Sequence, residues 1–261
     1  MKTYGFIGCG NMGGILASCA AGRFGESVLL LDHNREKTEK IAAKFGARTA
    51  DLATIAAGCD YIFLGVKPNA LKGLLEELRP LLHDSAVIVS MAAGVALQTI
   101  EQILGTRPII RIMPNTPSAC GEGVVLYSPN AAVTPEQIED FREALADAGC
   151  VEAISEDKID AASALSGCGP AFVYMFIEAL ADGAVKCGLP RDKALHYAAQ
   201  TVLGAGKYVL ESGMHPGILK DGVCSPGGST IAGVATLESA AFRGAVMAAL
   251  EASYKRTKEL G

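Results

Sequence analysis

The stretch GFIGCGNMGG, Gly5 through Gly14, follows a short apolar run and precedes an alanine-rich segment. Its glycines at positions 8, 10 and 13 have the GxGxxG spacing of a turn that joins a strand to a helix and binds a dinucleotide. Gly8 permits a tight turn, Gly10 lets a pyrophosphate approach the backbone, and Gly13 permits close packing of helix on strand. Because the first N–H groups of that helix would face the phosphates, the motif predicts a Rossmann-like domain.

The first half of the chain repeats this strand-and-helix texture. Continuous apolar blocks, typical of strands buried on both faces of a parallel sheet, lie at residues 3–7, 28–31, 61–66, 87–90 and 108–113. Two more candidate strands lie at 124–127 and 150–154. Helices are expected at residues 12–21, 36–45 and 70–81. Another should begin at TPEQ, with Thr134 as the N-cap and Pro135 as the first helical residue.

Beyond about residue 155 the strand blocks give way to helical stretches, at 157–165, 171–187, 191–212, 218–222 and 230–260, the last with a break. The chain is therefore expected to be α/β, with a Rossmann-like parallel-sheet domain at 1–155 and an all-α domain at 156–261. The stretch Ala171–Cys187 is apolar on nearly every side. Because so small a domain has little interior, we expect part of this helix to pack on a second subunit; a monomeric bundle is the alternative.

Composition limits the partners. The chain has 261 residues, a net charge of −5 and a pI near 5.5, which argues against nucleic acid or an anionic membrane and favours small molecules. Its eight cysteines have irregular spacings without CxxC, as expected of reduced thiols in the cytoplasm. We expect no signal peptide, no membrane span and no metal site.

The second strand block ends at Asp32, about where an acidic residue contacts the adenosine ribose of NAD. Arg35, three residues later, could instead pair with the 2′-phosphate of NADP. The residues leave NADH and NADPH both open. The next strand ends, GVKP at 65–68 and SMAAG at 90–94, should lie at the same edge of the sheet, where ligands of parallel sheets bind.

A second glycine loop, CSPGGST, spans Cys224–Thr230. Gly227 and Gly228 expose backbone N–H groups, and Ser229 and Thr230 begin a helix, so the junction is suited to a carboxylate or phosphate. A plain helix cap is the alternative. In RIMPNTPSACGEG, residues 111–123, two prolines predict a shaped loop in which Asn115 lies near the substrate or serves only the turn.

These blocks together resemble pyrroline-5-carboxylate reductases over essentially the whole chain. The similarity rests on GFIGCGNMGGIL, VKP, RIMPNTP, ALSGCGPAFVY, HPGILKDGV and, most specifically, SPGGSTIAGVATLE. The resemblance implies reduction of 1-pyrroline-5-carboxylate to L-proline by NADPH, with NADH as the alternative, in the last step of proline biosynthesis. It also implies interlocked helices of two subunits, in some members assembled into decamers.

The resemblance implies roles for individual residues. The substrate carboxylate would lie on Gly227, Gly228 and Ser229, and Thr230 would lie near the ring nitrogen as the catalytic residue. Asn115, from its place in the loop after the fifth strand block, is also expected to contact the substrate. An imine nitrogen is readily protonated, so a strong protein acid is not required and positioning supplies much of the rate. Cofactor contacts are expected from Gly8, Gly10, Asn11, Met12, Gly13, Asp32, Asn34, Arg35, Val66, Lys67, Pro68, Ala92, Ala93, Gly94 and Asn115.

Three alternatives have distinct signatures. A 3-hydroxyacid dehydrogenase of similar design places a catalytic lysine soon after the interdomain glycines, whereas this chain offers none before Lys186. A regulatory protein that binds NADPH without turnover would not need the second glycine loop. Other cyclic imines stay open as substrates, because one methylene changes binding by only ~1–3 kcal/mol.

Overall fold

The computed structural model describes residues 2–260. Its contacts divide the chain into unit 1, which comprises Met1–Gly167 and Ser253–Gly261, and unit 2, Cys168–Ala252. The division falls twelve residues beyond the end of the strand-rich half, so the first turns of the following helix belong to unit 1. Each unit is described by itself.

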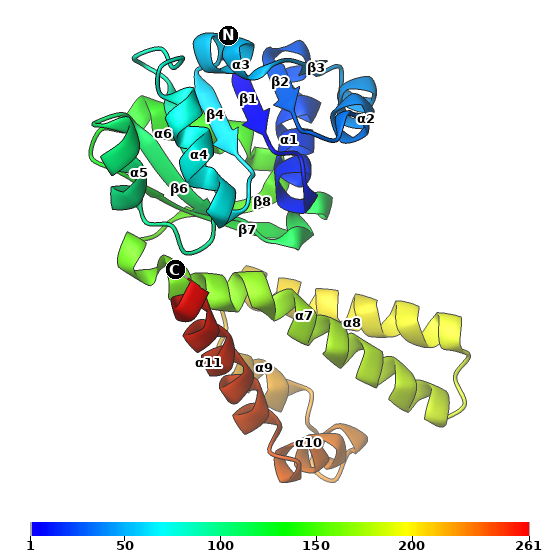
Figure 1. Ribbon diagram of the computed structural model, residues 1–261. Helices are drawn as coiled ribbons and strands as arrows, with labels where there is room; N and C mark the ends of the chain where they lie inside the picture. Colours follow the sequence, from blue (N-terminus) through cyan, green and yellow to red (C-terminus); the bar gives the residue numbers. More distant parts are fainter. Residues whose placement is uncertain (1, 261) are drawn as a thin grey trace. The chain divides into compact units, whose positions relative to one another are not determined.

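Unit 1 contains one eight-stranded sheet with the order β3-β2-β1-β4-β5-β6-β7-β8 (Figure 1). The strands are β1 (Tyr4–Ile7), β2 (Val28–Leu31), β3 (Arg48–Thr49), β4 (Tyr61–Leu64), β5 (Val87–Ser90), β6 (Ile109–Met113), β7 (Gly123–Pro129) and β8 (Gly149–Ala153). The first six run parallel, whereas β7 pairs antiparallel with β6 and β8 lies parallel to β7. The predicted parallel sheet is thus confirmed: β1, β2, β4, β5 and β6 were expected and all run parallel, and the two further candidate strands form β7 and β8.

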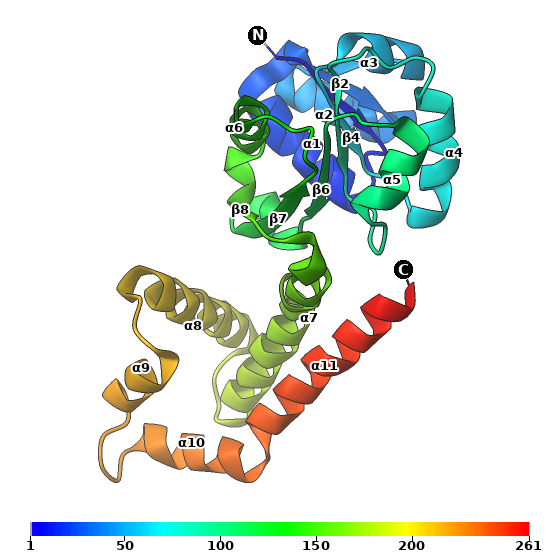
Figure 2. The ribbon, with the colours of Figure 1, turned by 90° about the vertical axis from the view of Figure 1, so that its left-hand side faces the viewer.

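Helices cover both faces of the sheet (Figure 2). One face packs on α1 (Asn11–Phe24), α2 (Arg35–Phe45) and α6 (Pro135–Ala144), and the other on α3 (Leu52–Gly58), α4 (Pro68–Leu78) and α5 (Leu97–Leu104). Along β1, Tyr4 and Phe6 join the first core and Ile7 the second. A strand whose side chains are apolar on both faces reads as the continuous apolar block seen in the sequence.

Some of the helices and strands were predicted correctly from local sequence patterns, and others were missed. The strands at 28–31 and 87–90 are confirmed, as is the start of α6, where Thr134 and Gln137 form a capping box. The sequence reading missed β3, α3 and α5, which have only two, seven and eight residues. Elements this short carry too few positions for a periodic pattern.

The helical stretches predicted at 157–165 and 171–187 are wrong as separate helices. They form one helix, α7 (Glu156–Lys186), with Pro170 inside it. The break predicted in the last stretch is confirmed, since α10 (Ser229–Ser239) ends before α11 (Phe242–Leu260). Between them Ala241 has φ +55°, a left-handed conformation that a helix interior does not tolerate.

Unit 2 consists of the later turns of α7, then α8 (Arg191–Ser212), α9 (Pro216–Gly222), α10 and most of α11. Among the described residues its buried apolar cluster holds only small side chains, Ala181, Ala194 and Ala198. Large apolar side chains are instead exposed, including Met175 at 69%, Leu210 at 84% and Met247 at 66%. Single exposed apolar residues are ordinary, but a set this large on one unit marks an interaction surface.

Length and composition alone would allow α7 to cross a bilayer, with a mean hydropathy of 1.4 over an 18-residue window, and α10 with α11 passes the same test as a bent pair. The expectation that the chain has no membrane span therefore stays a prediction.

Candidate functional site

The first glycine loop is held by contacts that only glycine permits. Gly8 has φ +91°, its N–H donates to the Leu31 carbonyl at 2.8 Å, and its carbonyl oxygen faces Gly13 and Gly65. A Cβ on Gly13 would lie 1.9 Å from the Gly8 oxygen, and one on Gly65 would lie 2.2 Å from it. The loop is thereby packed between α1 and the end of β4, next to the point where the strand order reverses.

Gly10 differs from these glycines because no described atom lies within 4 Å of where its Cβ would be. It is the N-cap of α1, in an extended conformation, and no side chain caps the helix. The first N–H groups of α1, from Asn11 to Gly13, consequently lack a capping side chain. An uncapped helix end beside open space is suited to a phosphate group.

Asp32 braces this loop. Its Oδ2 accepts a hydrogen bond from the Cys9 N–H at 2.7 Å, and its Oδ1 accepts one from the Asn34 N–H at 2.8 Å. Burial, together with the nearby Asp32 carboxylate, raises the pKa of the Cys9 thiol to about 12. Cys9 is therefore an uncharged thiol at neutral pH and adds no negative charge to the anion site.

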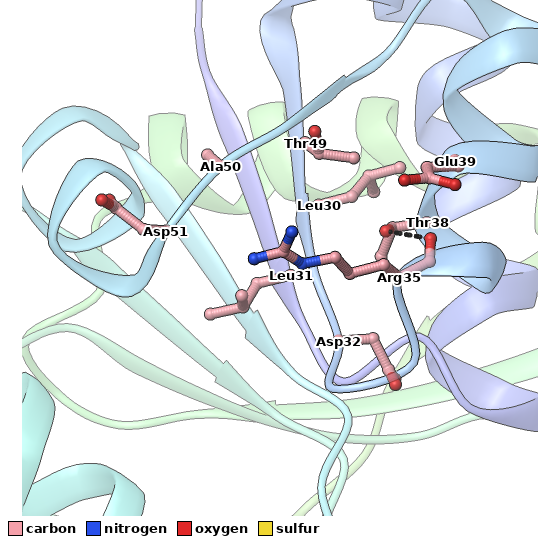
Figure 3. Close-up of a pocket in the computed structure, with 9 residues that line it drawn as sticks. All are labelled: Leu30, Leu31, Asp32, Arg35, Thr38, Glu39, Thr49, Ala50 and Asp51. Atoms are coloured by element: carbon pink, nitrogen blue, oxygen red, sulfur yellow. Dashed lines mark hydrogen bonds between the residues drawn. The ribbon is translucent and has the colours of Figure 1, made fainter.

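A pocket of about 380 Å³ adjoins Asp32 at the ends of β2 and β3 (Figure 3). Arg35 extends across it, while the Asp32 carboxylate points away from Arg35. No hydrogen bond or ion pair of the Arg35 side chain is seen among residues 2–260. Asn34 is committed to helix α2, because its side chain accepts from the Glu36 N–H at 3.1 Å. The lining residues are Leu30, Leu31, Asp32, Arg35, Thr38, Glu39, Thr49, Ala50 and Asp51.

Charge in this pocket is mixed. Arg35 is its only cation, against Asp32, Glu39 and Asp51. Asp51 accepts from the Thr54 N–H at 2.8 Å as the N-cap of α3. Hydrogen bonding to the side chain of Thr54, and then to its backbone, lowers the pKa of the Asp51 carboxyl group. The pocket can therefore offer carboxylates to ribose hydroxyls and one guanidinium to a phosphate.

The remaining predicted cofactor residues follow neighbouring strands. Val66, Lys67 and Pro68 connect β4 to α4, where Lys67 is the exposed N-cap and Pro68 the first helical residue. Ala92, Ala93 and Gly94 follow β5, and Gly94 turns the chain with φ +76°. Since β4 and β5 are parallel neighbours, both segments lie at the edge of the sheet that carries the glycine loop.

The second glycine loop forms a type II turn. The Gly228 N–H donates to the Ser225 carbonyl at 3.0 Å, Pro226 occupies the second position, and Gly227 has φ +68°. Gly228 is the N-cap of α10 and, again, no side chain caps the helix. Ser229 and Thr230 are exposed, and neither hydroxyl has a recorded partner within the described part of the chain. The expectation that Gly228 exposes its N–H is therefore wrong, because the turn uses that group. Unit 2 presents the uncapped N–H groups at the start of α10 and two hydroxyls on one helix end.

Asn115 has a more restricted environment than the sequence suggested. It is 7% exposed, its Oδ1 accepts from the Val124 N–H at 2.8 Å, and its Nδ2 donates to the Ser166 carbonyl at 2.9 Å. Only one hydrogen of its amide is left for a ligand.

Two of the four histidines, His83 and His215, make hydrogen bonds to the backbone. His215 Nδ1 accepts from the Gly217 N–H as the N-cap of α9, and His83 Nε2 lies 2.8 Å from the Cys59 carbonyl.

Sequence reasoning missed part of the site. Thr38, Thr49, Ala50 and Asp51 line the pocket beside Asp32 and Arg35. Because β3 is too short to predict, the pairing that brings Thr49 to Leu30 could not be found. Gly65 lies in a block that the sequence singled out, and its contact with Gly8 explains why that position is glycine.

The first site fits a nicotinamide dinucleotide. The uncapped α1 terminus suits the pyrophosphate, the open space at Gly10 lets it approach, and Asp32 and Arg35 lie where the adenosine ribose would bind. The second helix end is suited to one further anionic group.

Comparison with known proteins agrees with these features. The family model for pyrroline-5-carboxylate reductase dimerisation matches residues 156–260, and that for coenzyme F420-dependent NADP oxidoreductases matches residues 3–94. Pyrroline-5-carboxylate reductase of Escherichia coli is 42% identical over 99% of this chain and 98% of its own. The pyrroline carboxylate reductase structure from Plasmodium falciparum, with NADP bound, has TM-score 0.87 and 32% identity and covers 100% of this chain and 98% of its own. That from Coxiella burnetii has TM-score 0.91 and 33% identity, with the same coverage.

Proposed function

The chain belongs to the pyrroline-5-carboxylate reductase family, and we propose that its two uncapped helix ends serve the reduction of 1-pyrroline-5-carboxylate to L-proline by NAD(P)H. The overall change is pyrroline-5-carboxylate + NAD(P)H + H⁺ → L-proline + NAD(P)⁺. The single observation that carries the proposal is that each unit has one helix end suited to an anion, at Gly10 in unit 1 and at Gly228 in unit 2. The chain that carries both belongs to this family.

For the cofactor, we propose that α1 holds the pyrophosphate through the backbone of Gly10, Asn11, Met12 and Gly13. Asp32, Asn34 and Arg35 would hold the adenosine ribose and its phosphate, while Val66, Lys67, Pro68, Ala92, Ala93, Gly94 and Asn115 would flank the nicotinamide half. When bound, the nicotinamide supplies the hydride that reduces the imine carbon. We take NADPH as the main cofactor, because the Arg35 guanidinium can pair with a 2′-phosphate. NADH is the alternative, because Asp32, Glu39 and Asp51 line the same pocket.

For the substrate, we propose that the backbone of Gly227, Gly228 and Ser229 holds the carboxylate. The N–H groups of Gly227 and Ser229 would donate to it, because the N–H of Gly228 already donates to the Ser225 carbonyl. The field of the α10 terminus favours that anion. The Thr230 hydroxyl would then face the ring nitrogen: its oxygen accepts from the protonated imine, and its hydrogen can be donated to the amine lone pair after reduction. Asn115 has one free N–H left for the substrate.

The exposed apolar side chains of unit 2 support a homodimer, because water contact with so much apolar surface is unfavourable. The matching dimerisation model covers the same helices. Assembly of dimers into a decamer and a cytoplasmic location are proposed from the family and from reduced cysteines, all eight of which are free.

The proposal is tested by mixing purified protein with pyrroline-5-carboxylate and NADPH or NADH, following cofactor oxidation spectrophotometrically and detecting proline. Cofactor oxidation with stoichiometric proline is expected. Tight NADPH binding without proline would support a regulatory protein instead. A six-membered cyclic imine and a 3-hydroxyacid should be assayed in parallel. A higher turnover rate with either of them than with pyrroline-5-carboxylate would overturn the substrate assignment.

A further inference from the structure

Helix α7 is weakest where unit 1 ends. The last residue of unit 1 is Gly167, and the next three are Cys168, Gly169 and Pro170, yet the helix continues through them. Each interior glycine costs about 1 kcal/mol of helix propensity relative to alanine, and a proline costs about 3 kcal/mol. Intrinsic propensity would therefore end or bend the helix at this point.

Pro170 also creates a specific defect. It has no N–H, so it cannot donate to the carbonyl of Ser166, four residues earlier. The Nδ2 of Asn115 donates to that carbonyl at 2.9 Å. The orientation of the amide is unambiguous, because its other end faces the N–H of Val124 and must be the oxygen. A buried side chain from the loop after β6 thus replaces the donor that the helix lacks.

The first turns of α7 are bound to β6, the strand that precedes the loop of Asn115. Arg111 on β6, with its side chain 4% exposed, contacts Glu156 at 3.3 Å and Asp160 at 2.7 Å. Glu156 also accepts from the N–H of Leu97, at the start of α5, at 2.7 Å. The first turns of α7 are therefore fixed to unit 1, and the Asn115 bond is the last of these attachments before the glycines.

We propose that Asn115 is a positioning residue: by satisfying the Ser166 carbonyl next to Pro170, it fixes the direction in which α7 leaves unit 1. The inference rests on the proposed function, in which unit 1 holds the cofactor and unit 2 holds the substrate carboxylate. One covalent connection between them runs through residues 167–170. The other crosses α11 at Ala252 and Ser253, where the sequence has neither glycine nor proline.

The test is a double-mutant cycle of Asn115→Asp and Pro170→Ala. Aspartate keeps the acceptor for Val124 but cannot donate to Ser166, whereas alanine at position 170 restores the missing helix N–H. We expect Asn115→Asp to lower kcat about ten- to a hundredfold, with the Kd of NADPH changed less than about twofold. The double variant should return to within about threefold of the kcat of Pro170→Ala alone.

Asn130→Asp is the matched control. The Asn130 side chain also bridges two backbone groups, accepting from the Ile109 N–H at 3.1 Å and donating to the Arg107 carbonyl at 2.9 Å, but at the opposite end of β6. It should lower the thermal unfolding temperature without lowering kcat. If Asn115→Asp is insoluble, Asn115→Ala, which buries no charge, replaces it in the same cycle.

The outcomes are separable. If wild type makes no proline, the proposed function fails. If wild type is active but Asn115→Asp keeps its kcat, or loses it without rescue by Pro170→Ala, this inference alone is overturned; the unrescued loss would mean that Asn115 acts by touching substrate or cofactor. Rescue supports it, because a ligand contact would not be restored by an N–H inside α7.

Discussion

The two uncapped helix ends, of α1 and α10, begin alike and are built differently. Gly10 and Gly228 are both N-caps without a capping side chain. The first lies in a loop that is tightly packed except at Gly10 itself, with Gly8 against Gly13 and Gly65 and with Asp32 accepting a hydrogen bond from its backbone. The second follows an exposed proline-glycine turn, and the residues after it are exposed as well.

Because of this difference, substitutions in the two loops should have different effects. Unit 1 fixes its glycine loop through backbone packing, so substitutions there should act on the fold and on the proposed cofactor site together. Unit 2 presents N–H groups and hydroxyls on a bare helix end, so substitutions there should leave the fold alone and act on turnover. The predictions below separate these two kinds of effect.

The largest effect is expected for Gly13→Ala. The new Cβ would lie 1.9 Å from the Gly8 oxygen, which is backbone and cannot rotate away. Forcing the helix off the strand should destabilise the protein by about 3 kcal/mol, measured by denaturant unfolding.

Gly10→Ala is its control, since no described atom lies within 4 Å of the added methyl group. Stability should change by less than about 1 kcal/mol, whereas the methyl group occupies the space of the pyrophosphate and should raise the Kd of NADPH at least about tenfold. Equal losses of stability in both variants would contradict the packing argument.

Next in size is Thr230→Ala. Loss of a hydrogen bond to a charged ring nitrogen should lower kcat about ten- to a hundredfold, with unchanged unfolding temperature and Kd of NADPH. Thr230→Ser keeps the hydroxyl group and should stay within about threefold of wild type. Stopped-flow and steady-state kinetics give these values, and an unaltered kcat in Thr230→Ala would remove this residue from the mechanism.

The sequence predicts those parts of the two sites whose residues lie close together along the chain. Gly8, Gly10 and Gly13 lie within six residues, and Pro226 with Gly227 defines its turn within four, so both loops were predictable from spacing. The side of the pocket formed by Thr49 and Asp51 depends on β3, a strand of only two residues. The hydrogen bond from Asn115 to Ser166 joins residues that are 51 positions apart. Contacts of that kind require tertiary structure, and for the same reason α7 was predicted as two helices.

A smaller effect is expected from the adenosine pocket. Asp32→Ala removes the acceptor for ribose hydroxyls, while Arg35→Ala removes the cation for a 2′-phosphate. The ratio of kcat/KM for NADPH over NADH should rise about tenfold in the first variant and fall about tenfold in the second. Because Asp32 also braces Cys9 and Asn34, its variant should lose some affinity for both cofactors. A ratio that moves in neither variant would place the ribose elsewhere.

The smallest effect concerns Cys9 and tests whether the first site is as closed as its packing implies. Burial first, and the Asp32 charge second, raise the pKa of its thiol to about 12. A raised thiol pKa means that the neutral form persists as the pH rises, so the thiolate, which is the form that reacts, should be scarce up to about pH 11. Iodoacetamide at pH 8 followed by peptide mass spectrometry should therefore modify the exposed Cys120 and Cys187 while leaving Cys9 intact, and NADPH should not be needed for that protection. If Cys9 reacts as fast as Cys187 in the free protein and slows only when NADPH is added, the glycine loop opens without its ligand, and the contrast between a preformed first site and a bare second one is lost.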